Sequence, residues 1–373
     1  MSARFSVPAG VAPAWDAVVL RNGVVTYSGR GGEAGGAGPL IFDVASLTKP
    51  LVTGTLAALL VKDGRIGLDA PAAEWLPGFR GGGKEQVTVR QLLAHSSGLP
   101  AWRPWFERAM ADPVAGKAFL PPAERPADLA EAFARGREIV VDALGEEPLE
   151  APPGTRALYG DPGFIALGLL VEAAGGAPLD RQFADRVAAP MGLADTFFVT
   201  AGKVATGLAP CAGRRYAPTE QCEHRHELNQ GTVNDDNAWA MGGVAGHAGL
   251  FSTASNVARL GQEWLLAMEG HGRILDARLA REFARQDGTP GSERGLAWDT
   301  PSAAASSIGA KLGRGPLGAI GHLGYTGCSL WIDRDRQLVC VLLTNHVSPA
   351  GRRPAEILAV RQAFHDAVAE ATG

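Results

Sequence analysis

Strand-like segments occur near both ends of this 373-residue chain and are scarce in between. Near the start, residues 16–28 hold two β-branched runs separated by Asn22-Gly23, a pair typical of a tight hairpin turn. Near the end, short apolar runs typical of strands cover residues 295–299, 319–322, 328–332 and 338–344. The pattern predicts one sheet built from both ends of the chain, with the middle of the chain inserted as a separate region.

Helical periodicity dominates that middle region and also flanks the predicted strands. It is clearest over residues 127–144, 162–174, 179–191, 252–268 and 353–371. We therefore predict an α+β fold, an α/β sandwich in which helices flank an antiparallel sheet. Residues 1–64 and 241–373 would form the sheet domain, and residues 65–240 an inserted, mostly helical domain.

Composition narrows the possible partners. Lys and Arg number 35 against 39 Asp and Glu, so the net charge of -4 gives no sign of nucleic-acid binding. Four cysteines are too few for a disulfide scaffold. The uncharged stretches 50–61 and 162–171 are shorter than the ~18 to 20 apolar residues of a membrane span, so we expect no membrane anchor. Residues 1–15 are interrupted by proline and glycine and do not resemble a secretory signal, which favours a cytoplasmic location.

A serine and a lysine stand three residues apart, at Ser46 and Lys49, where a short extended run passes into a helical pattern. Positions i and i+3 share one face of a helix, so the two side chains can touch. The serine needs a base, and the lysine can serve if burial and nearby positive potential lower its pKa. Taken alone, the pair is more typical of a capping serine beside a surface lysine.

Two further short motifs follow in order, Tyr159-Gly160-Asp161 and His322-Leu323-Gly324. Together with Ser46 and Lys49 they resemble the S-x-x-K, Y-x-N and K-T-G elements of the serine β-lactamase and penicillin-binding protein superfamily. The chain is most similar to its class C-like branch, which includes esterases and DD-peptidases. Wider segments share the resemblance, among them FDVASLTKP and GHAGLFSTASNVARL, and it covers about residues 15–370.

The resemblance implies a role for each motif residue. Ser46 would be the acylated nucleophile and Lys49 would help to remove its proton. Tyr159 would relay the proton to the leaving group, although a tyrosine packed in the core is the alternative. The backbone N–H groups of Ser46 and Tyr325 would form the oxyanion hole. Gly324 would leave room for substrate along the strand edge.

The departures from the family pattern bear on the substrate. Asp161 replaces an asparagine, and a carboxylate cannot donate a hydrogen bond to an acylamino carbonyl. His322 and Leu323 replace the lysine and the hydroxyl of K-T-G, although an unperturbed His322 would become cationic below pH ~6.5 and imitate the lysine. An uncharged ester needs none of these lost groups.

We therefore expect a carboxylic-ester hydrolase that acts on small uncharged acyl substrates. The alternatives are a β-lactamase or D-alanyl-D-alanine carboxypeptidase, an acyltransferase, and a non-catalytic binding module. The partner would be a small-molecule ester, amide or β-lactam.

One more segment resembles a bacterial subgroup of penicillin-binding-protein-like hydrolases. Residues 231–249 are similar to a V-H-D-x-N-A stretch followed by G-H-A-G-L-F, with Asn234 where the subgroup has histidine. His247 is therefore a candidate for the site. The predicted substrate-binding residues are Asp161, His247, His322, Gly324 and Thr326.

The remaining candidates have plainer interpretations. Zinc is bound by thiolates and imidazoles, but the spacing of Cys211, Cys222, His224 and His226 matches no zinc-finger pattern. A reduced cysteine pair, or a local disulfide in an exported protein, explains this loop better, and we expect no metal and no cofactor. The resemblance makes His95 structural. Trp102 and Trp105 fit either the roof of an acyl pocket or helix packing.

Overall fold

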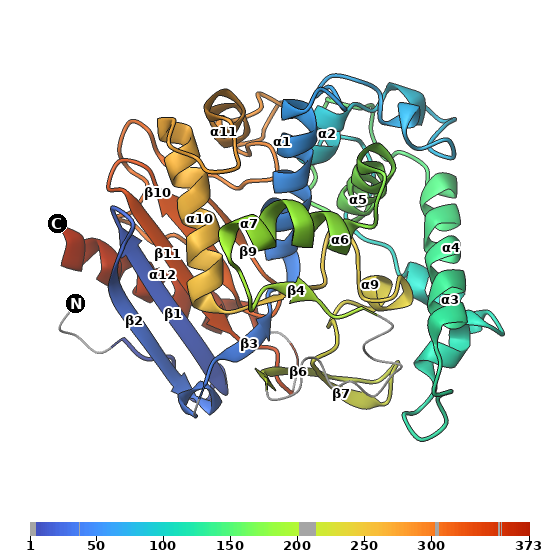
Figure 1. Ribbon diagram of the computed structural model, residues 1–373, viewed down its shortest axis with the longest axis horizontal. Coiled ribbons are helices and arrows are strands. Elements are labelled where there is room, and N and C mark those ends of the chain that lie inside the picture. Colours follow the sequence, from blue (N-terminus) through green and yellow to red (C-terminus); the bar gives the residue numbers. More distant parts are fainter. Residues whose placement is uncertain (1–4, 37, 201–213, 303–305, 350, 352) are drawn as a thin grey trace.

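Both ends of the chain contribute strands to one antiparallel sheet in the computed structural model, which describes residues 5–36, 38–200, 214–302, 306–349, 351 and 353–373. The five strands lie in the order β2-β1-β11-β10-β9. Their bounds are β1 (Ala14–Arg21), β2 (Val24–Gly32), β9 (Ala319–Leu323), β10 (Ser329–Asp333) and β11 (Leu338–Thr344). Strands β1 and β11 pair from Trp15 opposite Thr344 to Arg21 opposite Leu338. The predicted sheet is confirmed (Figure 1).

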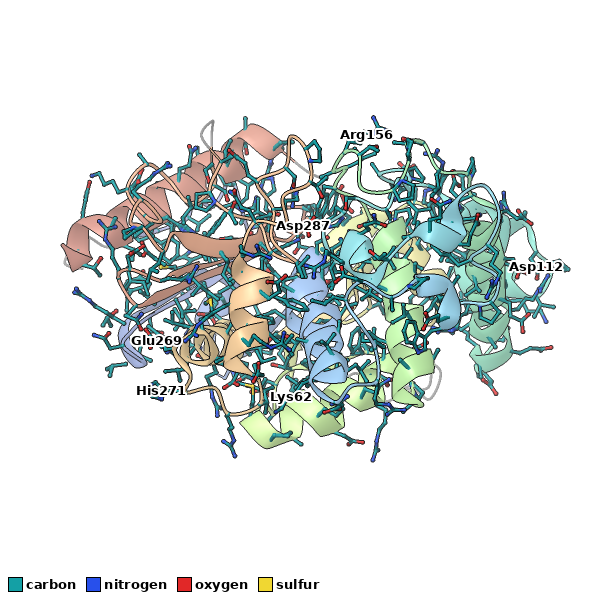
Figure 2. All side chains as sticks on the ribbon, turned by 90° about the horizontal axis from the view of Figure 1, so that it is seen from above. Lys62, Asp112, Arg156, Glu269, His271 and Asp287 are labelled. Carbon is teal, nitrogen blue, oxygen red and sulfur yellow. The ribbon has the colours of Figure 1, made fainter. Side chains whose placement is uncertain are left out.

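Each face of this sheet is covered by a helix. Successive side chains of a strand point to opposite faces, and in β1 both sets are apolar. Val18 and Leu20 belong to one core with α10 (Ala254–Glu269). Trp15 and Val19 belong to a second core with α12 (Pro354–Thr372). Figure 2 shows α10 and α12 on opposite sides of the strands.

The remaining long helices lie beside the sheet rather than on it, and Asp112 marks the far end of this region in Figure 2. The predicted helices appear as α4 (Ala130–Glu146), α5 (Pro162–Gly175), and the continuous segment of α6 (Leu179–Phe183) and α7 (Ala189–Met191). Shorter helices complete the region: α1 (Thr55–Lys62), α2 (Val89–Leu93), α3 (Trp105–Ala111), α9 (Asp236–Ala240) and α11 (Ala277–Ala284). No described helix is by itself long and apolar enough to span a membrane; α5 and the segment 179–191 reach that length only when joined across a 70° bend.

One expected strand is absent. Residues 295–299 form no strand, and only Asp299 bridges to Gly321. The middle of the chain does contain strands, but they are too short for an alternating pattern to show in the sequence. They are β4 (Phe197–Phe198), β5 (Arg215–Tyr216), β6 (Pro218–Cys222) and β7 (Glu227–Gln230).

A second sheet joins the two predicted domains. Its order is β4-β8-β3-β5, in which β3 (Leu40–Asp43) and β8 (Leu250–Ser252) come from the predicted sheet domain. Strands β6 and β7 pair only with each other in the described part of the chain. The domain boundaries at residues 64/65 and 240/241 stay a prediction.

Candidate active site

Ser46 lies where β3 passes toward α1. The residue before it, Ala45, has a φ of 48°, a backbone conformation that is unfavourable for a residue other than glycine. The carboxylate of Asp43 holds this turn by accepting a hydrogen bond from the Ala45 N–H at 2.8 Å. A 3₁₀ turn over Ala45–Leu47 and a π-helical turn over Lys49–Gly54 then lead into α1. The local fold therefore presents Ser46 at the end of a strand.

Lys49 connects three of the predicted site residues. Its Nζ lies 2.8 Å from Ser46 Oγ, 3.1 Å from Tyr159 OH and 2.7 Å from Asp161 Oδ1. The lysine side chain is fully buried. The structure thus brings Ser46 and Lys49 together with Tyr159 and Asp161. More than 100 residues of chain separate Lys49 from Tyr159 and from Asp161.

The expectation that the pKa of this lysine could be lowered was wrong. Burial alone would lower the pKa of Lys49, but the charges and hydrogen bonds of Asp161 and Tyr159 outweigh burial and raise it. An ammonium group has three N–H donors. Three oxygens, on Ser46, Tyr159 and Asp161, surround it at hydrogen-bond distance. Lys49 is therefore a cation at neutral pH.

Tyr159 is held between two other side chains. The His95 ring packs on it with centroids 4.6 Å apart, and His95 Nδ1 accepts a hydrogen bond from the Gly160 N–H at 3.2 Å. On the ring lies the guanidinium of Arg294, 4.8 Å from the centroid. His95, which the resemblance makes structural, thus packs directly against the site. Arg294, which forms an ion pair with Asp299, was missed because it belongs to no motif.

His322 lies in the cavity wall at the end of β9. Its ring centroid is 5.7 Å from that of Tyr159, and its Nδ1 lies 2.8 Å from the Leu323 carbonyl oxygen. Burial, followed by the positive charges of Lys49 and Arg294, holds the pKa of His322 well below its usual value. The expected cationic histidine near pH ~6.5 was therefore wrong.

The segment after β9 lies against the backbone that precedes Ser46. A Cβ on Gly324 would lie 2.5 Å from the Val44 carbonyl oxygen, so this glycine makes room for the protein's own backbone. Tyr325 lines the cavity, and its hydroxyl donates to Glu220 Oε1 at 3.0 Å. Thr326 was expected to bind substrate, but it is buried outside the cavity wall and its hydroxyl donates to the Asp43 carbonyl at 2.8 Å.

A buried arginine on α12 supports the same segment. Arg361 donates hydrogen bonds to the carbonyl oxygens of Gly324, Gly327 and Cys328 at 2.9, 3.2 and 2.8 Å. Because three carbonyls share one guanidinium, the loop that carries Tyr325 is tied to the last helix. No sequence motif indicated this link.

His247 lies at the site, paired with an aspartate. Its Nε2 is 2.9 Å from Asp235 Oδ1, and its carbonyl oxygen is 3.5 Å from Lys49 Nζ. Asp235 also caps α9 by accepting from the Ala238 N–H at 2.7 Å. Burial would raise the pKa of Asp235, but His247 outweighs it and lowers the pKa to about 2. Asp235 lies in the segment singled out in the sequence, yet its role was not predicted.

These side chains surround a cavity of about 590 Å³. Of the predicted residues, those in its wall are Ser46, Tyr159, Asp161, His247, His322, Gly324 and Tyr325. Trp102 also lines the cavity, whereas Trp105 is buried in α3.

Neither Cys222 nor His224 lines the cavity, although each contacts a residue that does. Cys211 is outside the described residues, so the proposed cysteine pair stays a prediction. Cys222 is buried, with its Sγ 3.5 Å from Asp236 Oδ1, and the His224 ring packs on Phe106. Within the described ranges, the side chains close enough to share a metal ion are instead Asp161, Asp235 and His247.

Comparisons with known proteins identify the family and the relatives of this chain. A family model described as Beta-lactamase matches residues 9–364. A protein of Salmonella schwarzengrund (strain CVM19633), named "Putative D-alanyl-D-alanine carboxypeptidase", is 28% identical over 319 residues, which are 82% of this chain and 69% of that protein.

Solved structures share the fold. EstCE1, described as a hydrolase with promiscuous acyltransferase activity, matches with a TM-score of 0.65 and 21% identity over 95% of this chain and 94% of EstCE1. The octameric penicillin-binding protein homologue from Pyrococcus abyssi matches with a TM-score of 0.66 and 19% identity over 96% of this chain and 74% of that chain. These likenesses confirm the predicted fold class.

Proposed function

Because the chain belongs to the β-lactamase family, we propose that it is a serine hydrolase that cleaves esters of small acyl groups through an acyl-enzyme on Ser46. The observation that carries this proposal is the contact of Lys49 Nζ with both Ser46 Oγ and Tyr159 OH, at 2.8 and 3.1 Å, in the wall of a large cavity. A nucleophile and the groups that move its proton must lie within hydrogen-bond reach of one another. Ser46, Lys49 and Tyr159 meet that requirement.

The reaction has two halves. In the first, Ser46 Oγ bonds to the acyl carbon and its proton passes to the Lys49–Tyr159 pair. The bond from the acyl carbon to the alcohol oxygen then breaks, and the alcohol leaves with that proton. In the second, water attacks the acyl carbon, the bond to Ser46 Oγ breaks, and the free acid is released as Oγ regains a proton.

The charges in the cavity favour esters over β-lactams and D-alanyl peptides. Asp161 holds Lys49 and has no amide donor to offer an acylamino carbonyl. The low pKa of His322 keeps that ring neutral, and Leu323 carries no hydroxyl, so neither replaces the K-T-G groups. The positive charge of Arg294 is already paired with the carboxylate of Asp299, so it is not left for a substrate carboxylate. An acyl group without a carboxylate therefore suits this site best.

Replacing the nucleophile tests the proposal. We expect Ser46→Ala to lower turnover of 4-nitrophenyl butyrate on the order of 10³-fold or more, because the motifs offer no second nucleophile. Lys49→Ala and Tyr159→Phe should each cause losses of similar size that do not add, and circular dichroism would check that each variant is folded. Wild type should also react with a fluorophosphonate at Ser46. Full turnover by Ser46→Ala would overturn the assignment, and no labelling would favour the binding module.

Selectivity is tested with nitrocefin. The wild type should have a kcat/KM for the butyrate ester at least about 100-fold above that for nitrocefin, because a missing partner for a polar group is costly. The double variant Asp161→Asn with Leu323→Thr should move this ratio toward nitrocefin. Equal turnover of both substrates by the wild type would favour the β-lactamase alternative. Product analysis in the presence of an alcohol would detect the acyltransferase alternative, which EstCE1 exemplifies.

A further inference from the structure

We propose that Asp161 and Asp235 form a subsite for a substrate ammonium group, so that the preferred substrates are aminoacyl esters with a free amino group next to the acyl carbon. The inference rests on the proposed function, because it assumes acylation of Ser46. It narrows the acyl group from any small one without a carboxylate to one that carries an amine.

The position of Asp161 fixes which part of the substrate would meet it. Two short hydrogen bonds meet at Lys49 Nζ, one to Ser46 Oγ at 2.8 Å and one to Asp161 Oδ1 at 2.7 Å. The carboxylate is therefore near the atom that attacks the acyl carbon. An α-amino group is separated from that carbon by a single carbon atom, so it falls within reach of Asp161.

The spacing of the two carboxylates suits one ammonium. An oxygen of Asp161 and an oxygen of Asp235 lie within 4.8 Å of each other. A tetrahedral ammonium that makes two N–H···O bonds of about 2.8 Å spans roughly 4.6 Å between the two acceptors. The limit of 4.8 Å between the two oxygens is therefore compatible with one ammonium that binds both carboxylates.

Both carboxylates also have acceptor capacity left over. Among the described residues, hydrogen bonds to Asp161 and Asp235 all end on Oδ1, and Oδ2 of each has no donor. Both side chains line the cavity and are partly exposed, at 20% and 25%, whereas Lys49 and His247 behind them are buried. A ligand in the cavity can thus reach the two carboxylates directly.

Asp235 offers an ionised carboxylate to a ligand, because its pKa is lowered to about 2, chiefly by His247. Each carboxylate of the pair already has one basic partner at Oδ1, which is Lys49 for Asp161 and His247 for Asp235. The Oδ2 atoms are therefore the acceptors left for a ligand ammonium.

A divalent metal suits the cluster less well. The Lys49 ammonium already contacts the Asp161 carboxylate, and a doubly charged ion would have to share that carboxylate with it. At the same position, a singly charged ammonium meets half the repulsion from the Lys49 ammonium that a divalent ion meets.

The experiment compares alanyl esters with an isobutyryl ester of the same shape. All are 4-nitrobenzyl esters, and the alanyl ester is tested as both enantiomers. Each alanyl ester carries an ammonium group where the isobutyryl ester carries a methyl group. We expect the wild type to favour one alanyl ester over the isobutyryl ester at least 10-fold in kcat/KM. This ratio is corrected by dividing it by the ratio of the hydroxide-catalysed hydrolysis rates of the same two esters. Asp235→Asn should lower that corrected ratio at least 10-fold, because the ammonium loses a charged partner.

Glu220→Gln is the matched control. Glu220 lines the same cavity and loses the same charge, but it lies on β6 beside Tyr325. Its corrected ratio should stay within 3-fold of wild type, and an equal fall in both variants would overturn the proposal in favour of general negative potential. Equal wild-type turnover of the alanyl and isobutyryl esters would overturn the subsite but leave the proposed function standing. Turnover of neither ester would contradict the proposed function itself.

Treatment with a chelator distinguishes an ammonium subsite from a metal site. Prolonged dialysis against EDTA should leave the corrected ratio unchanged, and elemental analysis should find no stoichiometric zinc. One metal ion per chain, together with loss of the preference after chelation, would assign the cluster to a metal instead.

Discussion

At the scale of single residues, Asp161 changes what its neighbour Lys49 can do. An ammonium whose three N–H groups face three oxygens has no lone pair with which to take the proton of Ser46. The Tyr159 oxygen lies 3.1 Å from Lys49 Nζ, so the tyrosine is another group near the nucleophile that can take part in proton transfer. We therefore infer that the proton of Ser46 moves toward Tyr159.

A pH profile tests the link between Asp161 and Lys49. Asp161 raises the pKa of Lys49, so Asp161→Asn should lower it. One limb of the plot of kcat/KM against pH, acid or alkaline, reflects the pKa of Lys49. That limb should therefore move to lower pH. The measurement uses an ester without an amine, such as the isobutyrate, between pH 5 and about 11, a range that contains the usual lysine pKa. Glu220→Gln should leave both limbs in place, and an unchanged profile in Asp161→Asn would contradict the argument.

The sequence predicted which residues meet at the site better than it predicted their charges. Motif residues such as Ser46, Lys49 and Tyr159 were placed together correctly because each motif is short and local. The charge of Lys49 and the neutrality of His322 depend instead on burial and on partners distant in the chain, such as Arg294. The hydroxyl of Thr326 likewise has a partner distant in the chain, the Asp43 carbonyl, which its motif could not reveal.

At the scale of elements, helix α5 lies unusually close to the segment that carries His247. A Cβ on Gly168 would lie 2.7 Å from the Gly246 Cα, and one on Gly246 would lie 2.1 Å from the Phe164 carbonyl oxygen. Asp161 immediately precedes α5. The close approach of the two backbones therefore sets how far Asp161 stands from His247.

Adding one methyl group at this contact should destabilise the protein. Gly168→Ala forces α5 away from Gly246, and overpacking of this kind costs about 1–3 kcal/mol. We expect the Tm in a thermal melt to fall by roughly 2 °C or more. Gly163→Ala, in the same helix, is the matched control, because its Cβ would meet nothing nearer than 3.8 Å. A Tm that falls equally in both variants would show that the close contact is not the cause.

Element length explains which parts of the fold the sequence revealed. Helices such as α4, α5 and α10 are long enough for their periodicity to show, and each was predicted within a few residues. Strands of two residues, such as β4 and β5, contain no complete alternation. The apolar run 295–299 was mistaken for a strand because burial alone gives it the same composition.

At the scale of the whole molecule, the two ends of the chain meet in one sheet, and the last helix reaches the site from behind it. Strand β11 pairs with β1 on one side and with β10 on the other. Helix α12 packs on this sheet, and its Arg361 binds three carbonyl oxygens of the loop that carries Tyr325. The position of the Tyr325 N–H, which we propose as part of the oxyanion hole, therefore depends on a residue from the last helix.

Removing this support should slow catalysis without touching the nucleophile. Arg361→Met leaves the three buried carbonyls without their charged donor, so the loop should loosen and the Tyr325 N–H should be less well placed. We expect kcat for 4-nitrophenyl butyrate to fall at least about 10-fold, with a smaller change in KM, because an oxyanion hole acts mainly on the transition state. Labelling of Ser46 by a fluorophosphonate should slow in parallel, and Arg361→Lys should restore part of both rates.

Loss of stability alone could also lower activity, and Val368→Ala separates the two causes. Val368 is fully buried in the same helix, so truncating it leaves a cavity and lowers the Tm without touching the loop. At a temperature well below both melting transitions, Val368→Ala should keep kcat within about 2-fold of wild type, because a folded molecule retains the Arg361 contacts. If Arg361→Met kept the same kcat as Val368→Ala under those conditions, the last helix would stabilise the fold and have no part in positioning Tyr325.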